Sequence, residues 1–138
     1  MAEIFNKAGQ IAEAISTHEE YKYAYSEEII PFGAGVMRGT DPVDQCKLMV
    51  TGGKFIGLAL HRNVNLTDDL QYPEKSTVEL LQHGIVWVRV NEAVSAGDKA
   101  ACGEGGKWGK SGTANYDDVN GIYETSAAKD GFVKLRLK

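Results

Sequence analysis

The alternation of apolar and polar positions is clearest in residues 84–98. Val86, Val88 and Val90 are separated by isoleucine, tryptophan and arginine, in that order. A period of two in β-branched and aromatic residues predicts a β-strand. We expect the valine face to be buried, and the opposite face to be buried at its isoleucine end and solvated at Arg89. Such a strand needs partners on both of its edges, which the rest of the chain must supply.

The remaining apolar segments are short, and glycine, proline, asparagine and aspartate separate them. About eight short strands, with turns roughly every ten residues and no convincing long helix, predict a single-domain all-β protein, either a β-barrel or a β-sandwich. We expect a glycine-rich loop or hairpin tip in residues 103–112 and a long polar loop in residues 62–76. The further strand candidates are residues 29–33, 34–39, 45–50, 54–61, 122–126 and 132–138, and residues 77–81 lead into the central strand.

The first 28 residues differ from the rest because they are too polar to form a core element alone. We predict an N-terminal docking arm over residues 1–28 and a β-barrel or β-sandwich core over residues 29–138. Two isoleucines spaced four residues apart permit a short helix in the arm, whereas three tyrosines at every second position have strand spacing. The other interpretation of this segment is an ordinary first strand with a frayed N-terminus.

Large apolar side chains gather in and just after this arm, and they form the candidate interface. Tyrosine suits interfaces because its large amphipathic ring gives contact area at a low entropic cost. The alternative is that half of these side chains fill the barrel. The candidate interface residues are Ile11, Ile15, Tyr21, Tyr23, Tyr25, Ile29, Ile30 and Phe32.

The formal charge of the 138-residue chain is −4, and residues 1–30 carry this excess of acids. Because the rest is balanced and holds no basic patch, we expect no nucleic acid partner. No apolar run approaches ~18 residues and the first residues do not resemble a secretion signal, so we expect neither a membrane-spanning helix nor export. Cys46 and Cys102 should then be reduced and behave as small apolar residues.

Three candidate chemistries fail on residue type or spacing. The glycine-rich stretch ends in Gly109-Lys110-Ser111 like a phosphate-binding loop, but Glu104 stands where that motif requires glycine, and the following residues oppose a helix. His18, His61 and His83 lie far apart in the sequence, without the spacing of a metal site. A nucleophilic cysteine would need an activating histidine, and the sequence identifies none. We therefore expect no catalytic, metal or cofactor site.

Several segments follow one another along most of the chain as strands with glycine turns. They are residues 8–12, 23–33, 36–41, 54–61, 84–98 and 123–131. In this order and spacing they resemble the structural cement, or capsid decoration, proteins of tailed bacteriophages. No single segment carries the resemblance, because each is only a strand with a turn; the succession carries it.

The resemblance implies a small all-β protein without catalytic residues that binds the outer surface of an icosahedral head. It also implies a homotrimer that contacts the major capsid protein and stabilises the expanded shell against internal DNA pressure. Such a protein is made in the cytoplasm of the bacterial host and becomes part of the virion. The second hypothesis is a barrel-sandwich-type binding or carrier module, in which Lys107 or Lys110 would mimic a modifiable lysine at a hairpin tip.

Overall fold

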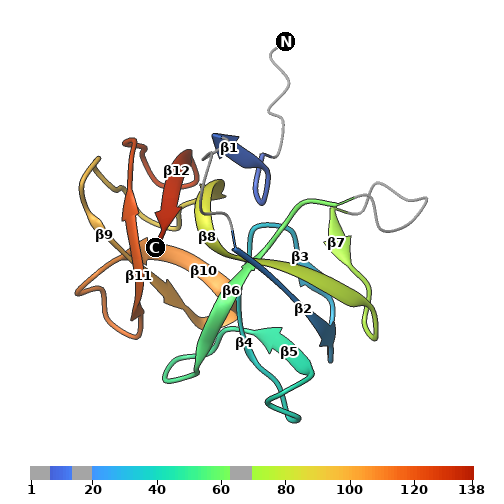
Figure 1. Ribbon diagram of the computed structural model, residues 1–138. Coiled ribbons are helices and arrows are strands. Elements are labelled where there is room, and N and C mark those ends of the chain that lie inside the picture. Colours follow the sequence, from blue (N-terminus) through green and yellow to red (C-terminus); the bar gives the residue numbers. More distant parts are fainter. Residues whose placement is uncertain (1–6, 14–19, 63–69) are drawn as a thin grey trace.

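Short strands make up the fold, because β-branched segments are brief and glycine turns interrupt them (Figure 1). The computed structural model describes residues 7–13, 20–62 and 70–138. The prediction of an all-β fold is confirmed, and among these residues no helix is long and apolar enough to cross a membrane. The strands are β1 (Ile11–Glu13), β2 (Glu20–Ser26), β3 (Ile30–Pro31), β4 (Gly35–Arg38), β5 (Gln45–Leu48), β6 (Phe55–Ala59), β7 (Gln71–Tyr72), β8 (Thr77–Arg89), β9 (Lys99–Gly103), β10 (Lys107–Lys110), β11 (Asp117–Tyr123) and β12 (Phe132–Leu137), with one 3₁₀ turn, η1 (Glu104–Gly106).

Five of these strands close into a barrel. β8 pairs with β2, β2 with β5, β5 with β4, β4 with β6, and β6 returns to β8. Each pair is antiparallel except β2–β5, which is parallel. Closure pairs each of these strands on both sides over part of its length; β2, for example, meets β5 at Tyr25 and Ser26.

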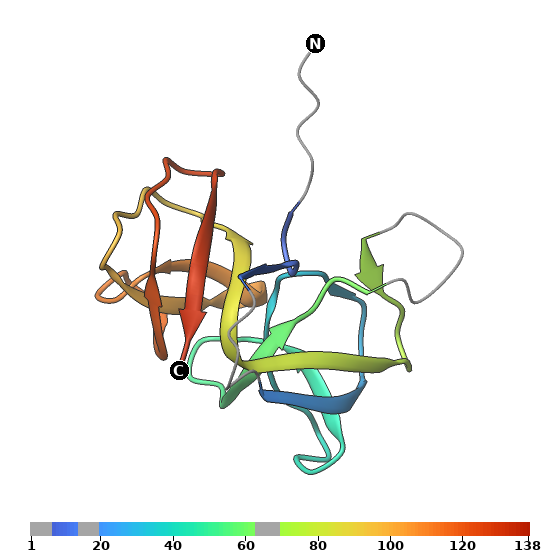
Figure 2. The same cartoon turned by 45° about the horizontal axis from the view of Figure 1, so that its top comes forward.

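Strand β8 runs through both halves of the molecule, and Figure 2 shows it curving from the barrel toward the C-terminal strands. Its first half pairs with β2 and β6, and from Gly84 onward it pairs with β12. Gly84 has a φ of +146°, which glycine adopts without the penalty of a Cβ atom. This long strand is the central strand that the sequence predicts, extended back to Thr77.

The second half of the molecule is a curled sheet with the order β8, β12, β11, β9 and β10. Its last strand returns to the end of β8, because Trp108 forms an isolated parallel bridge with Val90. The backbone nitrogen of Asn91 also donates to the Trp108 carbonyl oxygen at 2.7 Å. The chain therefore forms two β-units that share β8: the barrel, and the C-terminal unit of β9 to β12.

Each β-unit has its own hydrophobic core. Consecutive residues of β6 and β8 point to opposite faces, so Ala59 and Leu80 enter the barrel core, whereas Leu58 and Leu81 enter the second core. The barrel core contains Ala24, Ile30, Phe32, Ala34, Val36, Cys46, Ile56, Ala59, Tyr72, Val78 and Leu80. The second core contains Met49, Leu58, Leu60, Leu81, Val86, Val88, Val90, Val94, Ala100, Cys102, Trp108, Val119, Tyr123, Val133, Leu135 and Leu137.

The predicted faces of the central strand are confirmed. Val86, Val88 and Val90 are fully buried in the second core. On the opposite face, Ile85 is buried and Arg89, four residues further on, is exposed. The sequence period therefore gave both the strand and its orientation.

The prediction of a glycine-rich loop or hairpin tip in residues 103–112 is correct for η1, the turn that joins β9 to the antiparallel β10, and wrong for residues 107–110. This stretch contains η1 and strand β10, and Trp108 is 2% exposed. The indole Nε1 of Trp108 donates to the Gly33 carbonyl oxygen at 2.7 Å, which joins the C-terminal unit to the barrel. The glycines serve close packing rather than a loose loop, since a Cβ atom on Gly106 would lie 2.6 Å from the Gly35 carbonyl oxygen. The predicted loop at residues 62–76 also contains a strand, β7, which pairs with β3.

Part of the predicted arm belongs to the barrel. Residues 20–26 form β2, which pairs with β8 on one edge and with β5 on the other. The physical reason is that Ala24 and Ser26 are small and buried, and the Ser26 hydroxyl donates to the Pro73 carbonyl oxygen at 2.8 Å. Residues 11–13 form a strand on β8 rather than a helix. Residues 1–6, 14–19 and 63–69 lie outside the described part of the chain.

Candidate functional site

The exposed large apolar and aromatic side chains are distributed unevenly over the molecule. All of them that belong to the described residues come from the barrel half of the chain, residues 21–70, and the C-terminal unit contributes none. A concentration of such side chains on one part of a surface marks a site of interaction. They are Tyr21 (42% exposed), Tyr23 (64%), Tyr25 (46%), Ile29 (50%), Val43 (69%) and Leu70 (38%).

Three of these side chains form a stripe along the outer side of β2, which we call the tyrosine face. Tyr21, Tyr23 and Tyr25 stand at every second position of a strand, so they point away from the barrel core while Ala24 points into it. Pairing with β8 holds the backbone of all three tyrosines, and pairing with β5 holds Tyr25 on the other edge as well. The sequence therefore places three aromatic rings on a rigid support.

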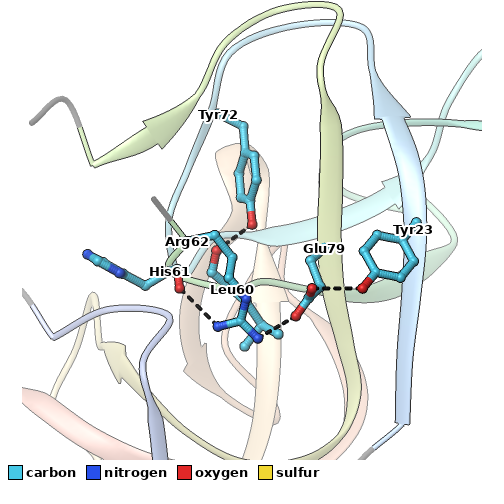
Figure 3. A network of polar contacts seen from close by, with 6 residues as sticks. All are labelled: Tyr23, Leu60, His61, Arg62, Tyr72 and Glu79. Carbon is cyan, nitrogen blue, oxygen red and sulfur yellow. Dashed lines mark hydrogen bonds and ion pairs between the residues drawn. The ribbon is translucent and has the colours of Figure 1, made fainter. Parts of the chain in front are cut away.

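The middle ring is fixed further by a network of polar contacts (Figure 3). The Tyr23 hydroxyl donates to Glu79 Oε2 at 3.0 Å, across the β2–β8 pairing. The other oxygen of Glu79 forms an ion pair with the Arg62 guanidinium. Arg62 Nη1 also donates to the His61 carbonyl oxygen at 3.1 Å. Figure 3 shows Glu79 between Tyr23 and Arg62, so one carboxylate holds a side chain on each side.

This network also shifts the pKa of Tyr23. Its hydrogen bond to Glu79, together with the negative charge of that carboxylate, raises the pKa of the phenol above its usual value. The hydroxyl is a neutral donor at neutral pH, as for any tyrosine, and the raised pKa extends this form further into the alkaline range. A ring held in one position before binding loses less conformational entropy when it is covered, which favours its use in an interface.

The structure does not bring all eight predicted interface residues to one surface. Ile30 and Phe32 are buried in the barrel core, because they alternate with the exposed Ile29 and Pro31. Phe32 packs edge-to-face against Tyr72, with ring centroids 5.1 Å apart. Tyr21, Tyr23, Tyr25 and Ile29 are exposed, Ile11 is half-buried in β1, and Ile15 lies outside the described residues.

Sequence reasoning missed Val43 and Leu70. Val43 lies in the turn before β5, and the neighbouring Asp44 carbonyl oxygen accepts a hydrogen bond from the Tyr25 backbone nitrogen at 2.8 Å. This contact places the turn beside one end of the tyrosine face. The sequence contained a signal for Val43, because it is a single valine between a proline and aspartates, where a core contact is not expected.

A chemical function would need metal ligands or a reactive nucleophile. No group of three or more histidine, cysteine, aspartate or glutamate side chains within them could hold a metal ion. Both cysteines are free and buried, as predicted. Burial raises the pKa of Cys46 to about 11 and that of Cys102 to about 12, so both remain thiols at neutral pH rather than nucleophilic thiolates.

We expect both thiols to resist modification in the folded protein. Below their raised pKa values Cys46 and Cys102 are protonated, and burial keeps reagents away from them. Treatment with an aromatic disulfide reagent at pH 8 should release almost no chromophore until urea unfolds the chain, when two thiols should react. Rapid reaction of one thiol in the absence of urea would mean that its core opens readily.

Five strands closed into a barrel and a row of exposed tyrosines on β2 define a β-barrel protein with a candidate interaction surface. The family model for structural cement proteins (E217 gp24/Pam3 gp6) matches residues 6–138. The chain therefore belongs to the phage structural cement protein family. It is a non-enzymatic component of phage capsids, as the resemblance in its sequence predicts.

Solved structures support the same fold at low sequence identity. A chain from the capsid of Myoviridae phage XM1 superposes with a TM-score of 0.75 and 14% identity, covering 95% of this chain and 89% of that one. The N base of the head fiber gp8.5 of bacteriophage phi29 superposes with a TM-score of 0.60 and 11% identity, covering 88% of this chain and 95% of that one. No curated protein matches the chain.

Proposed function

We propose that this protein binds the outer surface of the icosahedral head as a homotrimer, contacts the major capsid protein and stabilises the shell. The observation that carries the proposal is the concentration of exposed aromatic and apolar side chains on the barrel half, centred on the tyrosine face. Membership of the cement family supplies the context in which such a face meets a capsid. The similarity to a chain from the phage XM1 capsid agrees with this context, although at 14% identity it supports the fold alone.

The energetics favour many weak contacts over one strong one. Each copy that binds only the assembled shell lowers the free energy of that shell, so the stabilisation grows with occupancy. A trimer presents three tyrosine faces, and after the first contact the others bind at a high effective concentration. Rigid β-units suit this task because little order is lost on binding.

We assign the docking role within residues 1–28 to two separate parts. One is the tyrosine face on β2, which is anchored in the barrel. The other is the segment that precedes Lys7, which lies outside the described residues. The carrier hypothesis is less well supported, because both of its candidate lysines, Lys107 and Lys110, belong to strand β10 and lie outside the turn η1.

The experiment is a binding titration of purified protein against expanded capsids that lack it. We expect saturation at a stoichiometry that matches symmetric sites, a trimer by light scattering, and a higher melting temperature of the decorated shell. A tyrosine at the centre of an interface contributes at least about 2 kcal/mol, so Tyr23→Ala should weaken binding by roughly 30-fold.

Two matched variants separate the contributions of ring and network. Tyr23→Phe keeps the ring and removes only the hydrogen bond to Glu79, so it should weaken binding by less than about tenfold. Lys129→Ala changes an exposed residue of the C-terminal unit and should bind like the wild-type protein. A monomer that ignores the shell would refute the proposal, and equal losses for Tyr23→Ala and Lys129→Ala would refute the assigned face.

A further inference from the structure

A groove of about 320 Å³ lies where the barrel meets the C-terminal unit. Phe32, Val90 and Trp108 line it and are buried, so its floor is apolar. Arg89 and Lys107 line it and are exposed, so its rim carries positive charge. This volume is at the lower end of the range for ligand pockets, which suits one or two side chains rather than a whole strand.

The two cations of the rim keep their charge available for a partner. Within the described part of the chain, none of the four ion pairs involves Arg89 or Lys107. The Arg89 guanidinium lies over the Phe132 ring, 4.9 Å from its centroid, which holds it in position without removing its charge. Among the described residues, Asp130 is the one carboxylate that lines the groove. The groove therefore suits an apolar side chain that is accompanied by acids.

The turn before β5 presents this chemistry on the surface of the molecule. Val43 is 69% exposed, more than any other large apolar side chain of the described residues. It stands between Asp41 and Asp44, which are exposed as well. Neither carboxylate takes part in an ion pair with another described residue. We call residues 41–44 the acidic turn.

Hydrogen bonds hold the acidic turn in one shape. Asp41 Oδ1 accepts from the backbone nitrogens of Val43 at 3.0 Å and of Asp44 at 3.4 Å. Arg38 Nη1 donates to the Pro42 carbonyl oxygen at 2.7 Å, which ties the turn to the end of β4. Val43 is therefore displayed on a fixed support, and the turn loses little conformational freedom when a partner covers it.

We propose that the acidic turn of one copy inserts Val43 into the groove of a neighbouring copy, with its two aspartates facing the two cations of the rim. The inference rests on the proposed function, because that function places several copies side by side. It identifies a contact between subunits that is separate from the tyrosine face. Each copy presents one turn and one groove, so the contact is head-to-tail and can close into a ring such as a trimer.

Strand β4 keeps the acidic turn away from the groove of its own chain. Ala34, which lines the groove, immediately precedes β4, and Arg38, which holds the turn, is the last residue of this strand. The four residues of β4 span roughly 13 Å when extended. Pairing with β5 and with β6 fixes the strand on both edges. Turn and groove thus lie beyond opposite ends of one rigid strand, and a second copy is needed to bring them together.

The match of charge and shape identifies this second copy as the occupant of the groove. Among the exposed large apolar side chains of the described ranges, Val43 alone has an acid within two positions on each side. The rim offers two cations for these two carboxylates, and charge complementarity of this kind selects one partner over others. The chain therefore contains both halves of the contact.

Disulfide trapping in a double variant tests the contact in the full-length protein. Val43→Cys and Lys107→Cys are combined in one chain, which is oxidised gently and run on a non-reducing gel. A disulfide forms only when the two Cα atoms lie within about 7 Å, so we expect covalent dimers and trimers. Val43→Cys with Lys110→Cys is the matched control, because Lys110 lies on the same strand but outside the groove; it should yield at least about tenfold less. The buried native thiols do not compete.

A charge exchange tests the acidic contact independently. Asp44→Lys and Arg89→Glu should each raise the concentration at which the oligomer dissociates by about tenfold, the loss of one charge-assisted contact. The two substitutions in one chain should restore the wild-type value, and Lys110→Glu should leave it unchanged. Light scattering over a dilution series measures this concentration. Thermal melting checks that Arg89→Glu still folds, because this residue also contacts Phe132.

Each outcome decides the inference. Equal trapping at positions 107 and 110, or no trapping either in solution or on decorated capsids, would overturn it. Cross-linking of the single Val43→Cys variant would place two acidic turns against each other and also overturn it. A ladder of covalent products that continues past the trimer would support the contact and refute the proposed homotrimer. Capsid binding is scored separately: decoration without trapping refutes the groove contact alone, and trapping without decoration refutes the proposed function alone.

Discussion

Replacing Trp108 with alanine should lower the free energy of unfolding by about 3–5 kcal/mol. Trp108 is 2% exposed and lies where the C-terminal unit meets the barrel. Its ring meets that of Phe55 edge-to-face, with centroids 5.9 Å apart. Alanine removes these contacts, opens a cavity at the junction and leaves the Gly33 carbonyl oxygen without its buried donor. The loss of stability should affect the whole molecule, because both β-units depend on the contacts of Trp108.

Urea unfolding followed by far-ultraviolet circular dichroism measures this loss. Trp108→Phe keeps a buried ring but removes the indole N–H, so it should cost about 1–3 kcal/mol and isolate the hydrogen bond to Gly33. Lys110→Ala changes an exposed residue of the same strand and should stay within about 0.5 kcal/mol of wild type. A Trp108→Ala protein of nearly wild-type stability would mean that the two units do not support each other.

The strands that sequence predicts best are those whose two faces differ in polarity. Val133 and Leu135 in β12 alternate with lysine and arginine, Val86 and Val88 in β8 alternate with isoleucine, tryptophan and arginine, and all four are fully buried. A period of two gives both the strand and its orientation, because only one register buries every apolar side chain. The closure of the barrel could not be read in the same way. It depends on a parallel pairing of β2 with β5 and on the return of β6 to β8, and neither leaves a local signal.

Glycine misled the prediction for the stretch around Trp108. A high glycine content indicates a loop when only composition is considered, but here it permits backbones to approach closely. Gly35 is an example, since an added Cβ atom would lie 2.2 Å from the Cys102 sulfur. The tryptophan itself was the usable signal, because a large ring in a glycine-rich stretch needs a buried partner.

Part of the candidate site was predictable from the spacing of residues along the chain. The spacing of Tyr21, Tyr23 and Tyr25 fixes that they share a face, which the structure bears out. Ile30 turns inward while Ile29 remains exposed, and this difference depends on the pairing of β3 with β7. These two strands are far apart in the sequence, so their pairing could not be predicted from it. The contact of Arg62 with Glu79 likewise requires the barrel to be closed.

Gly9→Ala should destabilise the junction between the N-terminal segment and the barrel by about 2–5 kcal/mol. Gly9 has a φ of +83°, which is costly for alanine. A Cβ atom there would lie 2.8 Å from both the Ala59 oxygen and the Gly33 nitrogen, and 2.9 Å from the His61 nitrogen. These are backbone atoms, so no side-chain rotation can relieve the clash. The chain can escape only by releasing residues 7–13 from β8 or by distorting the barrel.

Amide hydrogen exchange distinguishes these two responses. The Trp87 nitrogen donates to the Gln10 oxygen and the His61 nitrogen to the Gly9 oxygen, each at 2.9 Å, so release of the segment should speed exchange at both amides. Distortion of the barrel would instead lower the global free energy of unfolding in urea.

Gly97→Ala is the matched control for backbone strain. Gly97 has a φ of +95°, but an added Cβ atom meets nothing within 4 Å. Its substitution therefore carries only the conformational cost of about 1–2 kcal/mol, and the excess loss in Gly9→Ala measures the packing of the N-terminal segment. If the two variants lose the same stability, the close approach of Gly9 to Gly33 and Ala59 contributes nothing. Residues 7–13 would then be only loosely held against the barrel, and their hydrogen bonds to Trp87 and His61 would add little to its stability.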